Sequence, residues 1–512
     1  MTSTANETER KYEAQPGRAM PRLDRLPRVA ATAGPQTQEL QADYYDTDDL
    51  RLIRNGITLR RRRGGSDPGW HLKLPLGGDT RREIRRPLGR GGRTVPDELA
   101  RLVRAYTRGA ELRLVARINT RRQVLTLVDA AGDSLAEVAA DDISAETLGA
   151  ETALSQWNEV EVELTGGDRG LLRDADARLR HEGLHPSPRT AKLERALAGQ
   201  LAQQDQRAPA NGHRDPAPAG SAGAVVLDYL RQQAARLKGF DPLVRADEPD
   251  SVHQMRVTTR RLRSTLQSFG QVIPRAQTTE LTAGLKWLGT VLGDARDAEV
   301  LASRLDRNLR ATPPELVLGP VIARVQGHFA PVLAGAREAV LAALDSARYF
   351  ALLDALDELV ATPPLTAVAA QPAGRVLPGE ARHAYQRTAR RMRRAQRTRP
   401  GHDRDVAYHE ARKAAKRARY SGEAISPAIG KRASRFTRQM KQVQTVLGDH
   451  QDAIVARGVD RDLGISAYLA GENAFSYGLL YEREEELAER LKKKANAVWA
   501  GQARPHFRRW AS

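Results

Sequence analysis

Residues 159–163 read EVEVE, with a carboxylate at every second position. This alternation predicts a strand, because successive side chains of a strand point to opposite faces. Glu159, Glu161 and Glu163 would then share one face, where like charges repel. A divalent cation would offset the repulsion, and hard carboxylate oxygens suit Mg²⁺ or Mn²⁺. The alternative is a solvated strand face whose carboxylates pair with lysines or arginines.

The first residues of the chain carry the same pattern, since Glu7, Glu9 and Lys11 alternate in ETERK. Basic residues alternate in other stretches that read as strands: Arg60 and Arg62, Lys73, Arg81 with Glu83 and Arg85, and Arg117 with Asn119 and Arg121. A barrel lined by acids on one side and bases on the other would bind a metal–polyphosphate, with the bases holding phosphoryl oxygens. Such a lining requires a water-filled tunnel, because a dry core could not hold it.

The first 200 residues are predicted to form short strands with few helices. The strands are 7–13, 41–49, 56–63, 69–75, 81–86, 113–122, 124–130, 135–139 and 157–164, and the helices are 96–109, 170–182 and 189–204. This pattern predicts an α+β domain over 1–202 that is built on a barrel-like antiparallel sheet. Residues 203–223 are rich in Pro, Ala and Gly and predict a linker.

The 512-residue chain has a formal net charge of +19, and the excess is local. Residues 251–450 hold 33 Lys and Arg against 17 Asp and Glu, whereas residues 1–200 hold 33 against 30. The former region is therefore predicted to meet a polyanion. The absence of cysteine excludes disulfides, thiol catalysis and thiolate metal sites. Without an apolar run of about 18 residues or an apolar leader, we expect no membrane segment and a cytoplasmic location.

Residues 224–512 are predicted to be all-helical and contain an internal repeat. Residues 252–264, VHQMRVTTRRLRS, align with 408–420, YHEARKAAKRARY. LKWLGTVLGDARDA at 285–298 aligns with MKQVQTVLGDHQDA at 440–453. The repeat predicts two helical bundles related by a pseudo-twofold axis, at about 224–365 and 380–512.

Each repeat carries a basic stripe with the spacing 3, 4, 3, which lies on one face of a helix. The stripes are His253, Arg256, Arg260 and Arg263, and His409, Arg412, Lys416 and Arg419. Like charges at i, i+4 destabilise a helix, so their repetition favours a polyanion surface. Two further stripes are His383, Arg387, Arg390 and Arg394, and Lys431, Arg435 and Arg438; Lys286 and Lys441 also correspond in the repeats. Protonation of the stripe histidines would strengthen binding in acid.

The repeats also share the pattern Leu-Gly-Asp-x-x-Asp, at 292–297 and 447–452. Glycine commonly follows the end of a helix, and aspartate commonly caps the start of one. We therefore expect both segments to be structural breaks between helices.

Residues 1–200 resemble the CYTH domain of the triphosphate tunnel metalloenzyme superfamily. The matching motifs, in order, are Glu7-x-Glu9-x-Lys11, Tyr45-Asp46-Thr47 with Leu50, Gly56-x-x-Leu59-Arg60-x-Arg62, Leu72-Lys73, Arg81-x-Glu83, Arg117 with Thr120-Arg121-Arg122, Glu159-x-Glu161-x-Glu163, and Lys192. The resemblance implies an eight-stranded antiparallel tunnel. There, two divalent cations help to cleave the terminal phosphate of a triphosphate or, in some members, to cyclise a nucleotide.

Carried over by position, the resemblance implies metal ligands at Glu7, Glu9, Glu159, Glu161 and Glu163. It implies triphosphate contacts at Lys11, Arg60, Arg62, Lys73, Arg81, Arg117, Arg121 and Lys192, with Glu161, Lys11 and Arg60 as catalytic residues. Arg85 stands where related sequences often have a second acid, which adds positive charge and favours binding over turnover. Ala191 precedes Lys192 where a serine is usual.

Residues 221–509 resemble the CHAD domain, the conserved histidine α-helical domain, through the repeated stripes and Leu-Gly-Asp-x-x-Asp motifs. The resemblance implies two four-helix bundles around a basic cavity that binds inorganic polyphosphate. The implied contacts are His253, Arg256, Arg260, Arg263, Lys286, His409, Arg412, Lys416, Arg419 and Lys441.

Together the two halves predict a hydrolase that acts on inorganic triphosphate or short polyphosphate with Mg²⁺ or Mn²⁺ and is coupled to polyphosphate binding. Alternatives are a weakly active adaptor at polyphosphate granules, an adenylate cyclase and a thiamine triphosphatase. Nucleic acid is not expected as a partner, because the helices have few aromatics for stacking and no helix-turn-helix signature. Nothing in the sequence indicates an oligomeric state.

Overall fold

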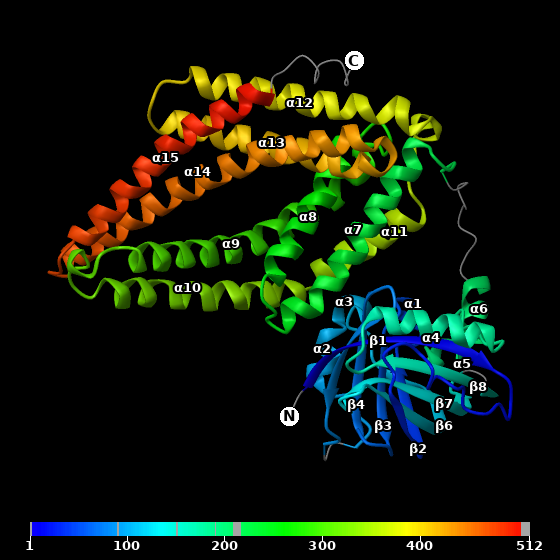
Figure 1. The fold of residues 1–512 in the computed structure, drawn as a ribbon. Helices are drawn as coiled ribbons and strands as arrows, with labels where there is room; N and C mark the ends of the chain where they lie inside the picture. The colour runs from blue at the N-terminus through cyan, green and yellow to red at the C-terminus, as the bar shows by residue number, and fades with distance from the viewer. Residues whose placement is uncertain (1–2, 90–91, 150–151, 190, 208–216, 503–512) are drawn as a thin grey trace. The chain divides into compact units, whose positions relative to one another are not determined.

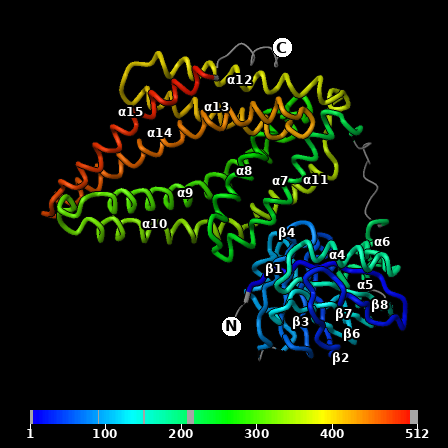
Figure 2. Tube along the Cα trace, in the orientation of Figure 1, coloured from blue at the N-terminus to red at the C-terminus, as the bar shows by residue number. Residues whose placement is uncertain are grey.

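The computed structural model describes residues 3–89, 92–149, 152–189, 191–207 and 217–502. The chain divides into two compact units, residues 1–210 and 211–512. Figure 1 shows a β unit at the N-terminal end and an all-helical unit after it, and Figure 2 traces the same path as a tube.

The first unit is a closed antiparallel barrel. Its strands are β1 (Ser3–Ala14), β2 (Ala31–Asp46), β3 (Thr58–Arg63), β4 (Gly69–Gly77), β5 (Thr80–Arg86), β6 (Arg113–Val128), β7 (Ser134–Thr147) and β8 (Ala153–Leu164). They pair in the order β5-β4-β3-β2-β6-β7-β8-β1, and pairing of β1 with β5 closes the ring. The two-residue β9 (His185–Pro186) adds to β1. The predicted eight-stranded tunnel fold is confirmed.

Several strands are longer than the sequence indicated, β2, β6 and β7 most of all. The predicted strands 113–122 and 124–130 form the single strand β6, and β2 begins ten residues before the predicted 41–49. The strands β2 and β6 pair along their whole length, from Ala31 opposite Val128 to Asp46 opposite Arg113, with two register shifts. Gln123, where a break was expected, pairs with Thr37. The partner strand thus carries β6 across a position whose side chain gives no strand signal.

Helices lie between and after the strands of the barrel. They are α1 (Arg51–Arg54), α2 (Asp97–Leu102), α3 (Arg104–Thr107), α4 (Arg169–His181), α5 (Lys192–Ala196) and α6 (Ala198–Arg207). The helix α4 packs on the outer face of the barrel. Val160 and Val162 of β8 pack into a core with Leu171 and Leu179 of α4. The valines of EVEVE therefore face α4, which leaves its three glutamates on the inner face.

Two of the predicted helices are divided. The predicted helix 96–109 is α2 and α3, which meet at Val103, and 189–204 is α5 and α6, which meet at Leu197, with residue 190 outside the described residues. The predicted linker 203–223 overlaps two helices, because α6 runs to Arg207 and α7 begins at Ala222. Residues 208–216 of that linker lie outside the described residues.

The second unit is all-helical, as predicted. Its α-helices are α7 (Ala222–Arg245), α8 (Ser251–Ser268), α9 (Thr279–Arg310), α10 (Val321–Leu344), α11 (Ala347–Ala361), α12 (Ala373–Arg397), α13 (His402–Ile429), α14 (Lys431–Leu469) and α15 (Phe475–Gln502). In the described ranges, no helix is both long enough and apolar enough to cross a membrane.

The two sequence repeats occupy equivalent helices. The basic stripes lie on α8 and α13, and the Leu-Gly-Asp-x-x-Asp segments lie on α9 and α14. The helix α8 packs on α9, α13 packs on α14, and α8 contacts α13 (Figure 1). The expectation that these segments break helices is wrong, since residues 292–297 and 447–452 are interior to α9 and α14.

Candidate functional site

The barrel encloses a charged cavity of about 310 Å³. All eight strands of the ring contribute to its lining, and Lys192 joins them from the start of α5. Leu193 and Leu197 pack in a core cluster with Trp157, and this packing fixes Lys192 at the barrel. The charged residues of the lining are Glu7, Glu9, Lys11, Arg60, Arg62, Asp67, Lys73, Arg81, Glu83, Arg85, Arg122, Glu137, Glu161, Glu163 and Lys192.

One group of carboxylates gathers at β7 and β8. Oxygens of Asp141, Glu159 and Glu161 lie within 4.8 Å of one another. The Lys192 Nζ atom is 2.6 Å from both glutamates and 3.0 Å from Asp141. Arg122 donates to Asp141 and Glu161, and Lys11 to Glu161. These cations outweigh burial and hold the pKa of Glu161 well below its usual range.

A second group of carboxylates lies on β1 and β8, beside the first. Glu7 contacts Lys73 and lies 3.1 Å from Arg85, and Glu9 lies 3.3 Å from Lys11. No ion pair to Glu163 exists among the described residues. Burial, with repulsion from Glu7, Glu9 and Glu161, raises the pKa of Glu163 to about 7. Glu163 therefore lacks the cation partners that Glu7 and Glu9 have.

The opposite wall is basic and is built on β3. The Arg60 guanidinium donates to the Tyr44 hydroxyl at 3.3 Å. Burial, with repulsion from Arg60 and Arg122, lowers the pKa of Arg62 to about 9. On β4, opposite Arg60, the buried His71 ring lies 2.9 Å from Glu83 through Nδ1 and 3.0 Å from the Asp67 carbonyl oxygen through Nε2, and burial lowers its pKa to about 4. These two contacts fix the ring beside the Glu83 carboxylate. An anion in the cavity would relieve the repulsion that Arg62 experiences.

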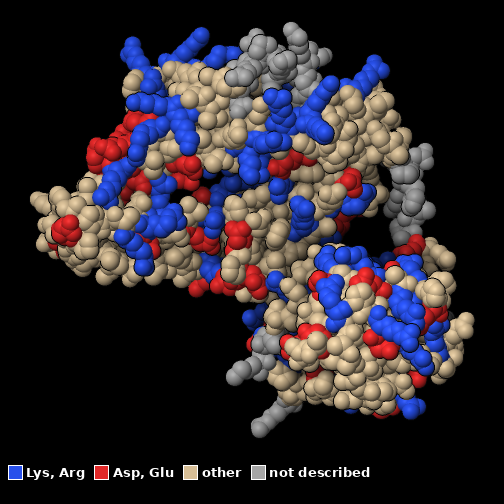
Figure 3. Space-filling view, viewed as in Figure 1, with Lys and Arg blue, Asp and Glu red and all other residues tan. Residues whose placement is uncertain are grey.

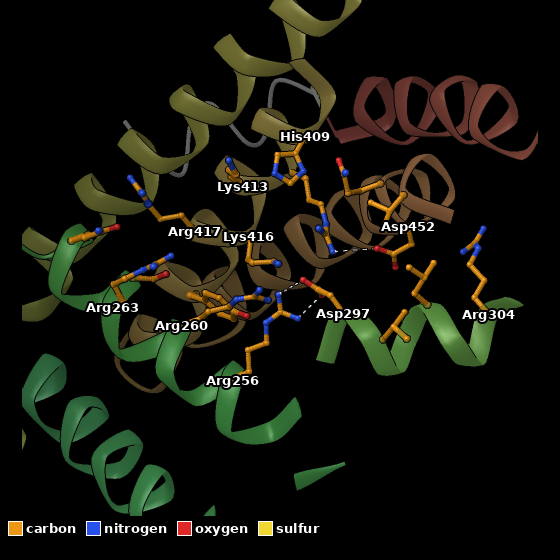
Figure 4. A pocket seen from close by; sticks show the side chains of 18 residues that line it. Arg256, Arg260, Arg263, Asp297, Arg304, His409, Lys413, Lys416, Arg417 and Asp452 are labelled. Carbon is orange, nitrogen blue, oxygen red and sulfur yellow. Dashed lines mark hydrogen bonds and ion pairs between the residues drawn. The ribbon is translucent and has the colours of Figure 1, made fainter. Parts of the chain in front are cut away.

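The helical unit holds a second charged cavity, of about 450 Å³, between α8, α9, α13 and α14 (Figure 4). Residues of both repeats line it. Its basic lining residues are Arg256, Arg260, Arg263, Arg304, His409, Arg412, Lys413, Lys416 and Arg417. Asp297 and Asp452 are the carboxylates in this lining.

The Leu-Gly-Asp-x-x-Asp segments seat one arginine in each repeat. The Arg256 guanidinium binds Asp297 through two contacts, at 2.7 and 3.1 Å. A Cβ atom at Gly293 would lie only 3.2 Å from that guanidinium, so glycine gives the arginine room to cross the helix. In the second repeat Arg412 lies 4.0 Å from Asp452 and passes over Gly448 in the same way. Glycine and aspartate four residues apart share a helix face, which explains the spacing.

Positive charge is in excess in this pocket. Burial, with repulsion from Arg412, Arg260 and Arg256, lowers the pKa of Lys416 to about 6. Burial and nearby Arg256 also lower the pKa of Arg260, to about 10. Basic side chains whose pKa is lowered by neighbouring positive charges are a physical sign of a site for a polyanion.

Comparisons with known proteins agree with this geometry. The model of the CYTH domain matches residues 5–191, and the model of the CHAD domain matches residues 228–459. The chain belongs to the proteins that carry a CYTH domain followed by a CHAD domain. It is 40% identical over 506 residues to an uncharacterized protein of Mycobacterium tuberculosis. The aligned residues cover 96% of this chain and 95% of the relative.

Solved structures resemble part of the chain. PptA from Streptomyces chartreusis aligns with 55% of this chain and 99% of its own, at 21% identity and a TM-score of 0.47. The CHAD domain from the plant Ricinus communis aligns with 57% of this chain and 96% of its own, at 24% identity and a TM-score of 0.40.

In the CYTH domain, most residues named from the sequence meet in one cavity. The residues that line it are Glu7, Glu9, Lys11, Arg60, Arg62, Lys73, Arg81, Glu161, Glu163 and Lys192. Glu159 lies beside the cavity and contacts the Lys192 ammonium. Arg117 and Arg121 are exceptions, since they lie on the outer face beside Asp43 and Glu39. Arg122 occupies the inner position instead, in register with Thr120 and Val124. Because Arg121 and Arg122 are adjacent, one residue of register decides which of them enters the tunnel.

Asp141 was also missed, because the predicted strand 135–139 ended before it. What marks Asp141 as a site residue is its position across the strands, where it is opposite both Arg122 on β6 and Glu159 on β8. A single sequence does not display this cross-strand arrangement.

In the CHAD domain, six of the ten named residues line the pocket: Arg256, Arg260, Arg263, His409, Arg412 and Lys416. Four do not: His253, Lys286, Arg419 and Lys441. Arg419 instead binds Glu423 at 2.7 Å and Gln444 at 3.3 Å. Arg304, Lys413, Arg417 and Tyr420 were missed. Lys413 and Arg417 are separated by one helical turn, and that spacing could have revealed them.

Proposed function

We propose that the CYTH tunnel hydrolyses inorganic triphosphate or short polyphosphate with Mg²⁺ or Mn²⁺, and that the CHAD domain binds longer inorganic polyphosphate. Members of the CYTH superfamily are metal-dependent triphosphatases or cyclases. The observation that carries the proposal is a closed tunnel whose acidic wall faces Arg60 and Arg62. We place the activity in the cytoplasm, including the surface of polyphosphate granules.

The basic wall suits a substrate that is a chain of phosphates and carries no organic group. Arg60, Arg62, Lys73 and Arg81 contribute to the same cavity from three successive strands. Planar guanidinium groups bind phosphoryl oxygens in pairs, and a lysine adds a compact charge. These residues would orient the substrate and stabilise charge on the transferring phosphoryl group.

The acidic wall fits a divalent cation, because hard ions take carboxylate oxygens. Glu7 and Glu9 are the ligands we favour, because both carboxylates face the cavity from β1 beside Glu163. Glu159 and Glu161 also offer oxygens, but the Lys192 ammonium lies among them. A bound ion would polarise a phosphoryl oxygen and make bound water more acidic.

Hydrolysis needs a group that accepts the proton of the attacking water. The water oxygen bonds to the terminal phosphorus, the bond to the bridging oxygen breaks, and pyrophosphate leaves. Glu161 is a poor base, because Lys11, Lys192 and Arg122 depress its pKa. Glu163, with a pKa of about 7, is the better base, since a catalytic base works best with a pKa near the operating pH.

Phosphate release from triphosphate with Mg²⁺ and with Mn²⁺ tests the proposal. Wild type should release phosphate, and Glu161→Gln/Glu163→Gln, which removes the proposed base Glu163, should lose at least a hundredfold in kcat, in the range of general-base and electrostatic catalytic groups. Glu146→Gln is the matched control, because Glu146 lies on β7 beside the outward Arg117. Release that persists in the double variant contradicts a catalytic role for the acidic strand.

A second candidate is a receptor that binds triphosphate without turnover. It is favoured by Arg85, which contacts both Glu7 and Glu83 and so supplies the positive charge a metal would bring. In that case wild type binds triphosphate but releases no phosphate with either metal. Arg85→Glu should then improve metal binding, which equilibrium dialysis with Mn²⁺ measures.

A further inference from the structure

A second cavity of the CHAD domain lies outside the central pocket. It measures about 860 Å³ and is formed by the first half of α12 and the junction of α13 with α14. Its charged lining residues are all basic or histidine: Arg375, Arg382, His383, Lys431 and Arg432. The central pocket, by contrast, contains two aspartates that already bind arginines. We call this cavity the α12 groove.

The basic residues of the α12 groove lack acidic partners. Among the described residues, no ion pair is formed by Arg375, Arg382, Lys431 or Arg432. The Arg382 Nε atom is buried and has no hydrogen-bond partner. His383 has one carboxylate nearby, that of Glu380 at 4.0 Å. Unpaired charges of one sign around a hollow create a positive potential that favours an anionic ligand.

Residues that disfavour a helix line the groove. Gly374, Pro378 and Gly379 lie in the first part of α12 and line the groove. Nothing lies within 4 Å of a Cβ atom built on either glycine. Each glycine costs a helix about 1 kcal/mol relative to alanine, and an interior proline costs more. The absence of packing against them shows that they do not serve a close contact between helices.

Positive charge connects the groove to the central pocket. Arg417 lines that pocket (Figure 4), and repulsion from Arg387 and Arg263 contributes to lowering its pKa. Arg387 stands one turn after His383 on α12, and His383 lines the groove. In Figure 3, Lys and Arg side chains gather along the part of the surface where Figure 1 places α12. From Arg387 to Arg375 the helix spans about 18 Å.

We propose that the α12 groove is a second polyanion site, which takes the part of a polyphosphate chain that extends out of the central pocket past Arg417 and Arg387. The inference rests on the proposed polyphosphate binding by the CHAD domain. It assigns the groove a linear polyanion as its ligand. It also requires that the ligand be long enough to reach the groove from the central pocket. Triphosphate is too short to reach from the pocket across this distance, whereas a chain of several tens of phosphates is not.

The test compares triphosphate and long-chain polyphosphate binding to the full-length protein, by calorimetry at one ionic strength. The groove variant is Arg375→Gln/Arg432→Gln, which changes two exposed side chains and leaves the folded core intact. We expect it to weaken long-chain binding about tenfold, as two modest charge contacts would. Triphosphate binding should change less than twofold. The salt dependence of long-chain binding should also become shallower, since fewer phosphates are neutralised.

Two further variants separate the possible causes. Arg307→Gln/Arg310→Gln removes the same net charge from exposed positions on α9 outside both cavities, and it should bind both ligands like wild type. Arg260→Gln/Arg412→Gln, in the central pocket, should weaken both ligands. Wild-type affinity of the groove variant for long chains overturns the inference while the pocket variant still supports the proposed function. Failure of wild type to bind long chains overturns both.

Discussion

Lys416 is the residue at which polyphosphate binding and proton binding should be linked. Its side chain lies in the central CHAD pocket near Arg256, Arg260 and Arg412 (Figure 4). Burial and these three charges lower its pKa from 10.5 to about 6. At pH 7.5 the unliganded protein therefore carries a largely neutral amine at this position.

The size of the link between polyphosphate binding and proton binding follows from how far the pKa of Lys416 is lowered. A bound polyanion reverses the local potential, which favours the ammonium form and raises the pKa of Lys416 toward its ordinary value. Between pH 6 and the bound-state pKa, the complex then holds one more proton than the free protein. Affinity for the polyanion therefore falls as pH rises, by up to tenfold, or about 1.4 kcal/mol, for each pH unit.

Calorimetry in buffers of different ionisation enthalpy counts the protons taken up on binding. At pH 7.5 we expect an uptake approaching one proton for wild type. We expect almost none for Lys416→Arg, whose guanidinium stays charged. Lys413→Arg is the matched control, because Lys413 is an exposed lysine in the same lining, and it should behave like wild type. Equal uptake in Lys416→Arg and wild type, or affinity independent of pH from 7 to 8.5, would refute the reasoning.

Three further predictions concern single side chains. Arg122→Gln should weaken triphosphate binding to the tunnel at least tenfold, whereas Arg121→Gln should not; similar KM values for both variants would contradict the observed register. Gly293→Ala should raise the unfolding temperature through helix propensity, by up to about 1 kcal/mol of stability. It should also weaken polyphosphate binding, because its Cβ would lie 3.2 Å from Arg256; unchanged affinity would show that the arginine moves freely. Lys192→Met should destabilise the protein by about 3–5 kcal/mol, because three carboxylates lose their shared cation. Mn²⁺ should then raise its melting temperature more than that of wild type, and equal shifts would argue against cation replacement.

The sequence was most informative where charge and apolar residues alternate. In 159–163 the valines belong to the core under α4, so the glutamates had to face inward. In 113–130 both faces carry polar residues, and Arg121 and Arg122 are neighbours. A shift of one residue there would exchange the two faces, and it is opposed by Ile118, which is buried on the face of Arg122, and by Leu127, which is buried on the other face. The inward position of Arg122, opposite Asp141 on β7, therefore has a local signal in Ile118, which the neighbouring charged residues obscure.

The Leu-Gly-Asp-x-x-Asp segments show a different limit of sequence reasoning. Glycine lowers helix stability by about 1 kcal/mol, which made a helix end at Gly293 the simplest prediction. In the structure, α9 continues through Gly293, and Arg256 of α8 lies across it and binds Asp297. The helix tolerates its glycine because a side chain from another helix occupies the space. That partner stands 37 positions earlier in the chain, outside the reach of a local pattern.

The two cavities control their charge in opposite ways, and this suggests how the domains divide their work. In the tunnel, Lys11 and Lys192 bind the acidic wall internally, so a metal–triphosphate complex has to displace existing ion pairs. Binding there is opposed by the loss of those pairs, which also favours release of the shorter product. In the CHAD pocket Arg256 and Arg412 are paired with aspartates, but Arg260 is a cation held against repulsion from Arg256, and Lys416 can take up a proton when a polyanion binds. Each phosphate that enters relieves this repulsion, so affinity should grow with chain length. A protein built this way would retain long chains at one domain and exchange short ones at the other, and tethering would raise the local concentration of chain ends.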